Sequence, residues 1–341
     1  MRRSRSPVIK AGLYVITVAI LVYVVVYMPT PYMVNQPGTA EEVKPMVTIA
    51  GGDTEEQGTF MLTTVSVSYA NLALLISAQF REHAEVVRKE PDRNDEEYQT
   101  QQRYYMSTSQ SSAIMSAYRQ ADIAYGVVPE YVFIVGFSKT ITPKGDLHPG
   151  DILKEINGEK IGKFEDLSGL LQGKSPGDNV QLTYERGGKT DTQQVELVKI
   201  SEENGKTRAG LGVTVGEVRK IEPEDPAKEV KFADTRIGGP SAGLMFTLEI
   251  YNQLTPGDLS KGYRIAGTGT MSEDGTVGSI GGVQFKIVAS DRRDADIFFV
   301  PEDNYKEAKA KADQIKSDMK LVPVKSVQEA LDYLDQLEPA A

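Results

Sequence analysis

The sequence contains no cysteine and only two histidines, His83 and His148. Structural zinc sites need several Cys or His ligands at fixed spacing, and a thiol nucleophile needs a cysteine. Zinc-dependent hydrolysis and thiol chemistry are therefore excluded, and we expect no metal and no cofactor. The sequence also lacks the G-x-x-x-x-G-K-[ST] pattern of a P-loop, so it predicts no bound nucleotide.

Basic residues are in the minority. The chain has 38 Lys and Arg against 48 Asp and Glu, which gives a formal net charge of −10. Proteins that bind the phosphate backbone of nucleic acids need clustered Lys and Arg side chains. The composition therefore indicates that nucleic acid is not a partner.

One apolar run is long enough to cross a membrane. Residues 11–28 contain no charged side chain and as a helix would span roughly 27 Å, close to the thickness of the hydrocarbon core. Pro29 and Pro31 follow and end the helix. Four basic residues precede it, so we expect a cytoplasmic basic tail (1–10), a transmembrane anchor (11–28) and an extracytoplasmic body, in a single-pass protein of the cell membrane. The alternative is a cleaved signal peptide, which usually has a shorter apolar stretch and a small-residue cleavage site.

The segment 38–124 predicts a mixed α and β structure. Two β-rich runs, 46–50 and 60–67, are separated by a Gly-rich loop and are expected to form an antiparallel pair. Residues 72–80 are apolar with helical spacing, which predicts a core helix. Residues 95–125 are polar with few helix breakers and are expected to be helical.

The middle of the chain, 125–199, contains a recognisable pattern. It reads Lys144-Gly-Asp-Leu-His-Pro-Gly-Asp-Ile-Leu-Lys-Glu-Ile-Asn-Gly158 and resembles the core of a PDZ domain. The resemblance implies a groove between a helix at 164–171 and a strand with the peptide-binding residues Val132, Phe133 and Ile134. A peptide would bind there by adding a strand to the sheet edge, while apolar pockets accept its side chains.

A serine lies at the start of an apolar helix in the last third of the chain. The run Gly238-Gly-Pro-Ser-Ala-Gly243 ends in an apolar stretch, so Ser241 falls in the first helical turn. Free backbone amides and the positive end of the helix dipole gather there, which suits a nucleophile and the oxyanion that it creates. The alternative is structural, because serine is also a common helix cap in ordinary turns.

A serine nucleophile needs a base, and neither histidine lies in a suitable pattern. Lys286 follows a Gly-Gly turn and lies among apolar residues, namely Val283, Phe285, Ile287 and Val288. Burial lowers the pKa of a lysine toward neutrality and makes it a candidate base, although most lysines are solvated surface groups.

Together these residues resemble the serine–lysine proteolytic domain of the Lon family. The match covers about 208–337 and includes the serine motif, the Gly281-Gly-Val-Gln-Phe-Lys286 segment and the C-terminal pattern from Phe299 to Leu331. The resemblance implies that Ser241 and Lys286 are catalytic and that the Thr268 hydroxyl orients the lysine amine. The Ser241 amide, with one from Gly238 or Gly239, would form the oxyanion hole. The family has an acidic residue where this chain has Gly238.

The whole chain resembles the membrane-anchored PDZ–Lon-type serine proteases of Gram-positive bacteria. The resemblance implies an α+β protein with an N-terminal transmembrane helix, and a PDZ-like β-rich module inserted in or preceding a Lon-type α/β proteolytic domain. Without the ATPase domain of full Lon, we expect ATP-independent cleavage of extracytoplasmic peptides or flexible proteins, with the PDZ-like module selecting substrates or regulating cleavage. The alternative is a PDZ-type binding or adaptor protein on a proteolytically inactive scaffold.

Overall fold

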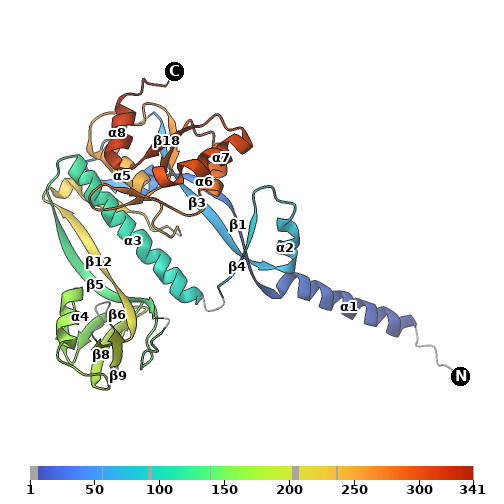
Figure 1. Cartoon of the computed structure of the whole chain (residues 1–341), viewed down its shortest axis with the longest axis vertical. Helices are drawn as coiled ribbons and strands as arrows, with labels where there is room; N and C mark the ends of the chain where they lie inside the picture. Colours follow the sequence, from blue (N-terminus) through green and yellow to red (C-terminus); the bar gives the residue numbers. More distant parts are fainter. Residues whose placement is uncertain are drawn as a thin grey trace.

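The computed structural model describes residues 7–55, 57–90, 94–138, 140–201, 207–235 and 237–340. An apolar helix, α1 (Pro7–Tyr27), projects from a body with two parts (Figure 1). Its segment Ile9–Tyr27 is long and apolar enough to cross a membrane. The helix ends just before Pro29, as the sequence predicts. Most of the predicted basic tail, residues 1–6, lies outside the described residues.

The larger part is built around a six-stranded sheet with the strand order β18-β17-β14-β3-β1-β4. β14 pairs in parallel with β3 and with β17, and β17 pairs in parallel with β18, whereas β1 is antiparallel to both of its neighbours. The strands are β1 (Pro29–Glu42), β3 (Thr59–Asn71), β4 (Glu85–Arg88), β14 (Arg264–Gly267), β17 (Ile297–Pro301) and β18 (Lys320–Val324). Strands from both ends of the chain therefore share one sheet.

Helices cover both faces of this sheet. Phe60 and Leu62 of β3 are buried in one core and Met61, between them, in another, because successive side chains of a strand point to opposite faces. The first core also holds residues of α3 (Asp95–Gln120), α5 (Gly243–Leu254) and α8 (Val327–Asp335), and the second those of α6 (Val283–Asp291) and α7 (Tyr305–Ile315). The predicted mixture of α and β structure is confirmed.

The start of this sheet differs from the prediction. The runs 46–50 and 60–67 do not pair: β2 (Val47–Ile49) pairs with β13 (Val230–Phe232), while β3 pairs with β1. β1 begins at Pro29, well before the predicted domain start at 38. Prolines and a glycine lower its strand propensity, and its register shifts between Pro37 and Ala40. The sequence pattern therefore did not predict this strand, in which a bulge accommodates Pro37 and the glycine after it.

The smaller, PDZ-like module contains a second sheet with the order β12-β5-β6-β8-β9, in which β7 also pairs with β6. Its elements are β5 (Tyr125–Phe137), β6 (Ile152–Ile156), β7 (Glu159–Lys160), α4 (Phe164–Leu171), β8 (Asn179–Arg186), β9 (Lys189–Glu196) and β12 (Val213–Pro223). β12 pairs with β5 from Val213 to Pro223. Strand β12 therefore extends the sheet of the predicted module 125–199 beyond its end, and the predicted start of the proteolytic domain at 208 stays a prediction.

The remaining elements are short. They are α2 (Leu72–Ala78), the hairpin β10 (Val198–Ser201) and β11 (Thr207–Gly210), the pair β15 (Thr270–Met271) and β16 (Val277–Gly278), and the 3-10 turns Lys44–Met46, Pro226–Lys228 and Glu302–Asn304.

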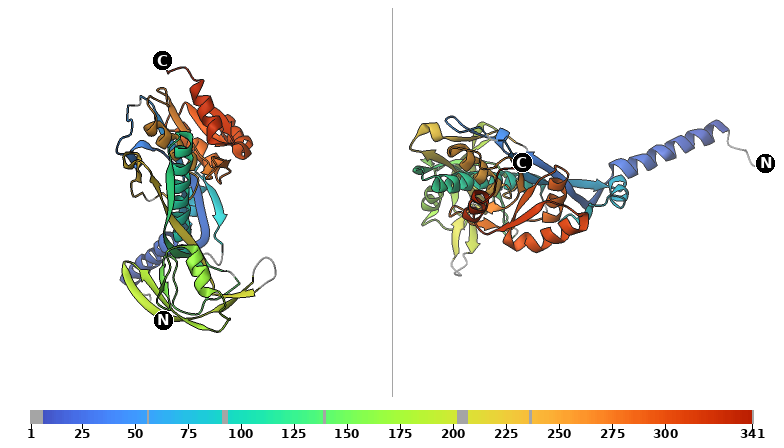
Figure 2. Two further views of the ribbon diagram at one scale, coloured as in Figure 1. Left: turned by 90° about the vertical axis from the view of Figure 1, so that its left-hand side faces the viewer. Right: turned by 90° about the horizontal axis from the view of Figure 1, so that it is seen from above.

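Helix α3 and the β5–β12 ribbon join the two parts (Figures 1 and 2). At the module end, a Glu97 carboxylate oxygen accepts the Phe137 N–H at 2.9 Å, and the Tyr104 ring packs edge-on against Phe133 at 5.4 Å between centroids. At the other end, Ile221 of β12 and Tyr118 of α3 are buried in the core of the larger part. The module is therefore held to the larger part along one helix.

We expect Glu97→Ala to lower the free energy of unfolding by about 1–2 kcal/mol, because it leaves the Phe137 amide without its charged acceptor. Glu97→Gln keeps an acceptor oxygen and should restore most of the loss. Glu96→Ala, at an exposed position on the same helix, is the matched control and should change stability by less than about 0.5 kcal/mol. Denaturant unfolding followed by circular dichroism measures the stability of all three variants. An equal loss of stability in both alanine variants would show that the Glu97–Phe137 hydrogen bond does not stabilise the protein.

Candidate active site

Ser241 lies in the turn that leads into α5. Gly238 to Pro240 form the turn, and the helix begins at Gly243 with Ala242 as its N-cap. The serine is thus placed at the amino end of a buried helix, where the helix dipole favours negative charge. Its own amide makes no backbone hydrogen bond within the described residues.

Lys286 lies on α6, one turn after a left-handed glycine. Gly282, the residue before the helix, has φ +71°, and a Cβ there would lie 3.2 Å from Val65 and Phe285. Glycine is the residue that adopts this backbone without strain. The turn directs the start of α6 toward β3. The Lys286 side chain is buried there, with an exposed fraction of 3%.

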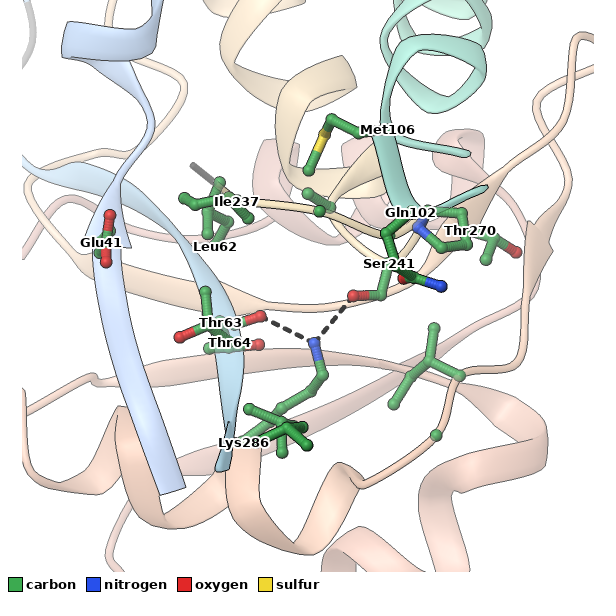
Figure 3. Close-up of a pocket in the computed structure, with 18 of the residues that line it drawn as sticks. Glu41, Leu62, Thr63, Thr64, Gln102, Met106, Ile237, Ser241, Thr270 and Lys286 are labelled. Atoms are coloured by element: carbon green, nitrogen blue, oxygen red, sulfur yellow. Dashed lines mark hydrogen bonds between the residues drawn. The ribbon is translucent and has the colours of Figure 1, made fainter. Parts of the chain in front are cut away.

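The two side chains meet between three elements (Figure 3). Lys286 Nζ lies 2.9 Å from Ser241 Oγ, just before α5, and 2.7 Å from the Thr63 carbonyl oxygen on β3. Burial lowers the pKa of Lys286 to about 7. Within the described residues no acidic side chain forms an ion pair with this lysine, so no opposite charge offsets the cost of burying its own. The amine is thus poised to be neutral near physiological pH.

Thr268 is close to the pair. Its hydroxyl donates to the Ser241 carbonyl oxygen at 3.0 Å. The hydrogen bonds of the Lys286 amine go to Ser241 and to the Thr63 carbonyl oxygen, so the role of Thr268 in orienting the amine stays a prediction. The part played by Thr63 could not be predicted, because a backbone oxygen in a strand carries no signal in the sequence. Thr268 fixes the backbone of the serine turn.

Helix α3 changes the expected oxyanion site. The Gly239 N–H donates to the Gln102 carbonyl oxygen at 2.9 Å, so Gly239 is not available as an oxyanion donor in this structure and that prediction is wrong for this residue. A Cβ on Gly238 would lie 3.0 Å from the Gln102 Cβ. A side chain at this position would thus press against α3. The Gly238 and Ser241 amides remain the candidates.

A cavity of about 690 Å³ opens above the pair. One wall is a face of α3 with a spacing of four residues, Tyr98, Gln102 and Met106. The other wall consists of β3 residues, among them Leu62, Val65 and Val67. The cavity therefore offers room for part of a peptide beside the serine, and both apolar and polar side chains line it. Within the described residues, no group of three or more His, Asp or Glu side chains could hold a metal ion.

The predicted peptide-binding strand of the module is not a free edge. Val132, Phe133 and Ile134 lie in β5, which has β12 on one side and β6 on the other, and all three are buried. The prediction is wrong because the edge strand is β12. A narrow groove of about 50 Å³ separates β12 from α4, with Leu167 and Ser168 on one side and Val213 and Val215 on the other. The signal was Gly210-Leu211-Gly212-Val213, directly before β12.

The comparisons with known proteins agree with these two parts. The family model described as the Lon protease (S16) C-terminal proteolytic domain matches residues 233–336, and that of the PDZ domain matches residues 124–197. The chain carries a Lon-type proteolytic domain and a PDZ domain. Both Ser241 and Lys286 lie within the Lon-type match, whereas β12 lies beyond the PDZ match.

Similar proteins include the Lon proteases of Azospirillum brasilense (30% identity over 157 residues), Acinetobacter baumannii (32% over 127) and Brucella abortus (35% over 95). These matches cover 45%, 37% and 28% of this chain, but only 18%, 15% and 12% of those proteins. A crystal structure of the PDZ domain of an SdrC-like protein from Listeria monocytogenes aligns with 25% of this chain and 87% of its own, at 26% identity and a TM-score of 0.22.

The buried lysine predicts a pH-dependent stability. Its pKa falls from 10.5 to about 7 on folding, so between these values the unfolded chain binds more protons and stability rises with pH. We expect Lys286→Met to be more stable than the wild type by roughly 3–5 kcal/mol near pH 6, with the difference vanishing near pH 10.5.

Urea unfolding of both proteins at several pH values measures this difference. Lys199→Met, an exposed lysine on β10, is the matched control and should show no such trend. A stability difference that does not change with pH would mean that burial does not disfavour the charged form of Lys286.

Proposed function

We propose that this protein is a serine endopeptidase in which Ser241 is the nucleophile and Lys286 the general base. The observation that carries the proposal is the 2.9 Å contact between the Ser241 hydroxyl and a buried amine whose pKa lies at about 7. A base works best when its pKa is close to the working pH. The Lon-type match of residues 233–336 supports the same class of activity.

The proposed reaction has two stages. Ser241 Oγ attacks the scissile carbonyl carbon while its proton passes to the Lys286 lone pair, and the Thr63 carbonyl keeps the amine in place. The protonated amine then gives this proton to the leaving nitrogen, the C–N bond breaks and an acyl ester remains on Ser241. In the second stage Lys286 takes a proton from water and the hydroxide attacks the ester carbon. The bond between this carbon and Ser241 Oγ then breaks, the carboxylic acid leaves, and Lys286 returns the proton to Ser241 Oγ.

The PDZ domain supplies a second place for the substrate. We place its peptide-binding edge on β12, opposite α4, where an extended segment can add to the sheet. The Phe164 amide donates to a Glu217 carboxylate oxygen at 2.8 Å, so α4 and β12 are also linked at one end of the groove. We infer that this groove selects substrates or regulates their cleavage.

The proposal extends to location and energy use. Helix α1 would anchor the protein in the cell membrane with an N-terminus in the cytoplasm and the catalytic body outside. The sequence has no P-loop, which supports cleavage without ATP and substrates that are peptides or flexible proteins. An origin in Gram-positive bacteria stays a prediction.

The alternative is a PDZ-type adaptor on an inactive scaffold. A scaffold without chemistry gains nothing from a buried lysine that lowers its stability, and it has no need of a serine hydroxyl at hydrogen-bonding distance. The paired side chains therefore favour the peptidase.

We expect Ser241→Ala and Lys286→Arg to abolish cleavage of casein and of unstructured peptides by the full chain in detergent. The first variant removes the nucleophile, and an arginine cannot deprotonate to act as a base. Both variants should lose at least about a thousandfold in rate. Control variants on and after α7, Lys309→Arg at an exposed position and Ser317→Ala at a half-buried one, should keep wild-type rates. Cleavage that persists in both catalytic variants would favour the adaptor.

We expect Ser168→Trp to block substrate binding in the groove without changing catalysis at Ser241. Ser168 is exposed on α4 and faces the groove, so an indole there fills the space opposite Val213 and Val215. Casein cleavage should slow, while hydrolysis of a peptide too short to reach the groove should not change. Glu165→Trp, on the same helix outside the groove lining, is the control. Equal loss with both substrates would show that the groove does not bind substrate.

A further inference from the structure

Helix α2 presents large apolar side chains to the outside. The sequence predicts residues 72–80 as a core helix, and this prediction is wrong: Leu72 is 38% exposed, Ile76 59% and Phe80, just after the helix, 86%. Their spacing of four residues places them on one face. Single exposed apolar residues are common, but three together on α2 and the turn after it mark an interaction surface.

The opposite face of α2 accounts for the fold of this region. Ala78, with the half-buried Leu74 and Leu75, packs on Val34 and Ala70 in a small core between β1, β3 and α2. The helix is thus apolar all round, although only half of it is covered by the body. No charged residue occurs between positions 57 and 80. A helix of this kind is normally buried on every side.

The position of α2 indicates what covers the outer face. Asn71 caps the helix by accepting the Leu74 N–H at 2.7 Å, and its side-chain amide donates to the Val26 carbonyl oxygen in the last turn of α1. In Figures 1 and 2, α2 lies beside the end of α1, and the β1–β3 ribbon leads away from it toward the body. The apolar face is therefore continuous with the apolar surface of α1.

We propose that Leu72, Ile76 and Phe80 lie in the lipid headgroup region of the membrane that α1 crosses. This rests on the proposed membrane anchor. Aromatic side chains gather at that depth in membrane proteins, and Tyr27, Tyr32 and Phe80 are all exposed there. Helix α2, which we call the foot, thus rests on the lipid surface and fixes the tilt of the body relative to the membrane.

The foot also sets the height of the catalytic serine. β3 runs without interruption from Thr63, which holds Lys286, to Asn71, which begins α2. These eight steps of a strand correspond to about 26 Å. A seated α2 therefore holds the catalytic pair at a set distance of this order from the membrane surface, and cleavage sites must reach that height.

Single tryptophans in the full chain test the proposal, because the natural sequence has none. Phe80→Trp, Tyr14→Trp in the middle of α1 and Tyr105→Trp on α3 would each be reconstituted in phosphatidylcholine–phosphatidylglycerol vesicles. The vesicles carry lipids brominated either close to the headgroup or close to the chain end. We expect the shallow label to quench the Phe80→Trp variant strongly and the deep label to quench the Tyr14→Trp variant. Neither label should quench the Tyr105→Trp variant.

The outcomes separate the foot from the anchor. Quenching at position 14 without quenching at position 80 overturns the foot and leaves the anchor intact, and quenching at neither contradicts the anchor as well. Protection of position 80 from aqueous iodide that grows with protein density, without lipid quenching, assigns the face to a second copy and also overturns the proposal. In the Phe80→Trp background, Ile76→Glu should weaken the lipid quenching, whereas Val128→Glu, at an exposed valine of β5, should not.

Discussion

The burial of one amine governs the structure around the proposed catalytic pair. Lys286 on α6 reaches across to the Thr63 carbonyl on β3 and to the hydroxyl of Ser241 before α5, so three elements must keep their places for the amine to stay enclosed. Removal from water lowers the pKa of the lysine to about 7, without the help of another charge. The same burial destabilises the fold, and the apolar cores on both faces of the six-stranded sheet offset this loss.

Helix α3 connects this pair with the rest of the molecule. One of its faces lines the cavity and holds the Gly239 amide through Gln102, while Glu97 and Tyr104 hold the PDZ domain. The edge strand of the PDZ sheet, β12, packs along the same helix. A peptide on β12 and a peptide at Ser241 would thus contact surfaces that share one rigid element, which gives the two domains a physical route for coupling.

The sequence predicts the parts whose chemistry lies in side chains. Ser241 and Lys286 stand out because each follows a Gly-rich turn next to an apolar helix: the serine precedes its helix and the lysine lies in its helix. The C-terminal strands and helices are predicted by their hydrophobic periodicity. Thr63 could not be found, since its contribution is a backbone oxygen. The prolines of β1 masked a strand, and the peptide-binding edge was sought in β5 because the Gly210-Leu211-Gly212 turn follows the PDZ core in the chain. Helix α2 looked like a core helix because periodicity reports an apolar face without saying what covers it.

The most direct test is to titrate the amine itself. Lysines labelled with carbon-13 at the ε-methylene report their own protonation by nuclear magnetic resonance, and the Lys286→Arg spectrum identifies the signal of Lys286. We predict that this signal titrates near pH 7, and that it still does so in Ser241→Ala, because burial and not the serine is the cause. A signal that titrates with the solvated lysines near pH 10.4 would contradict the account.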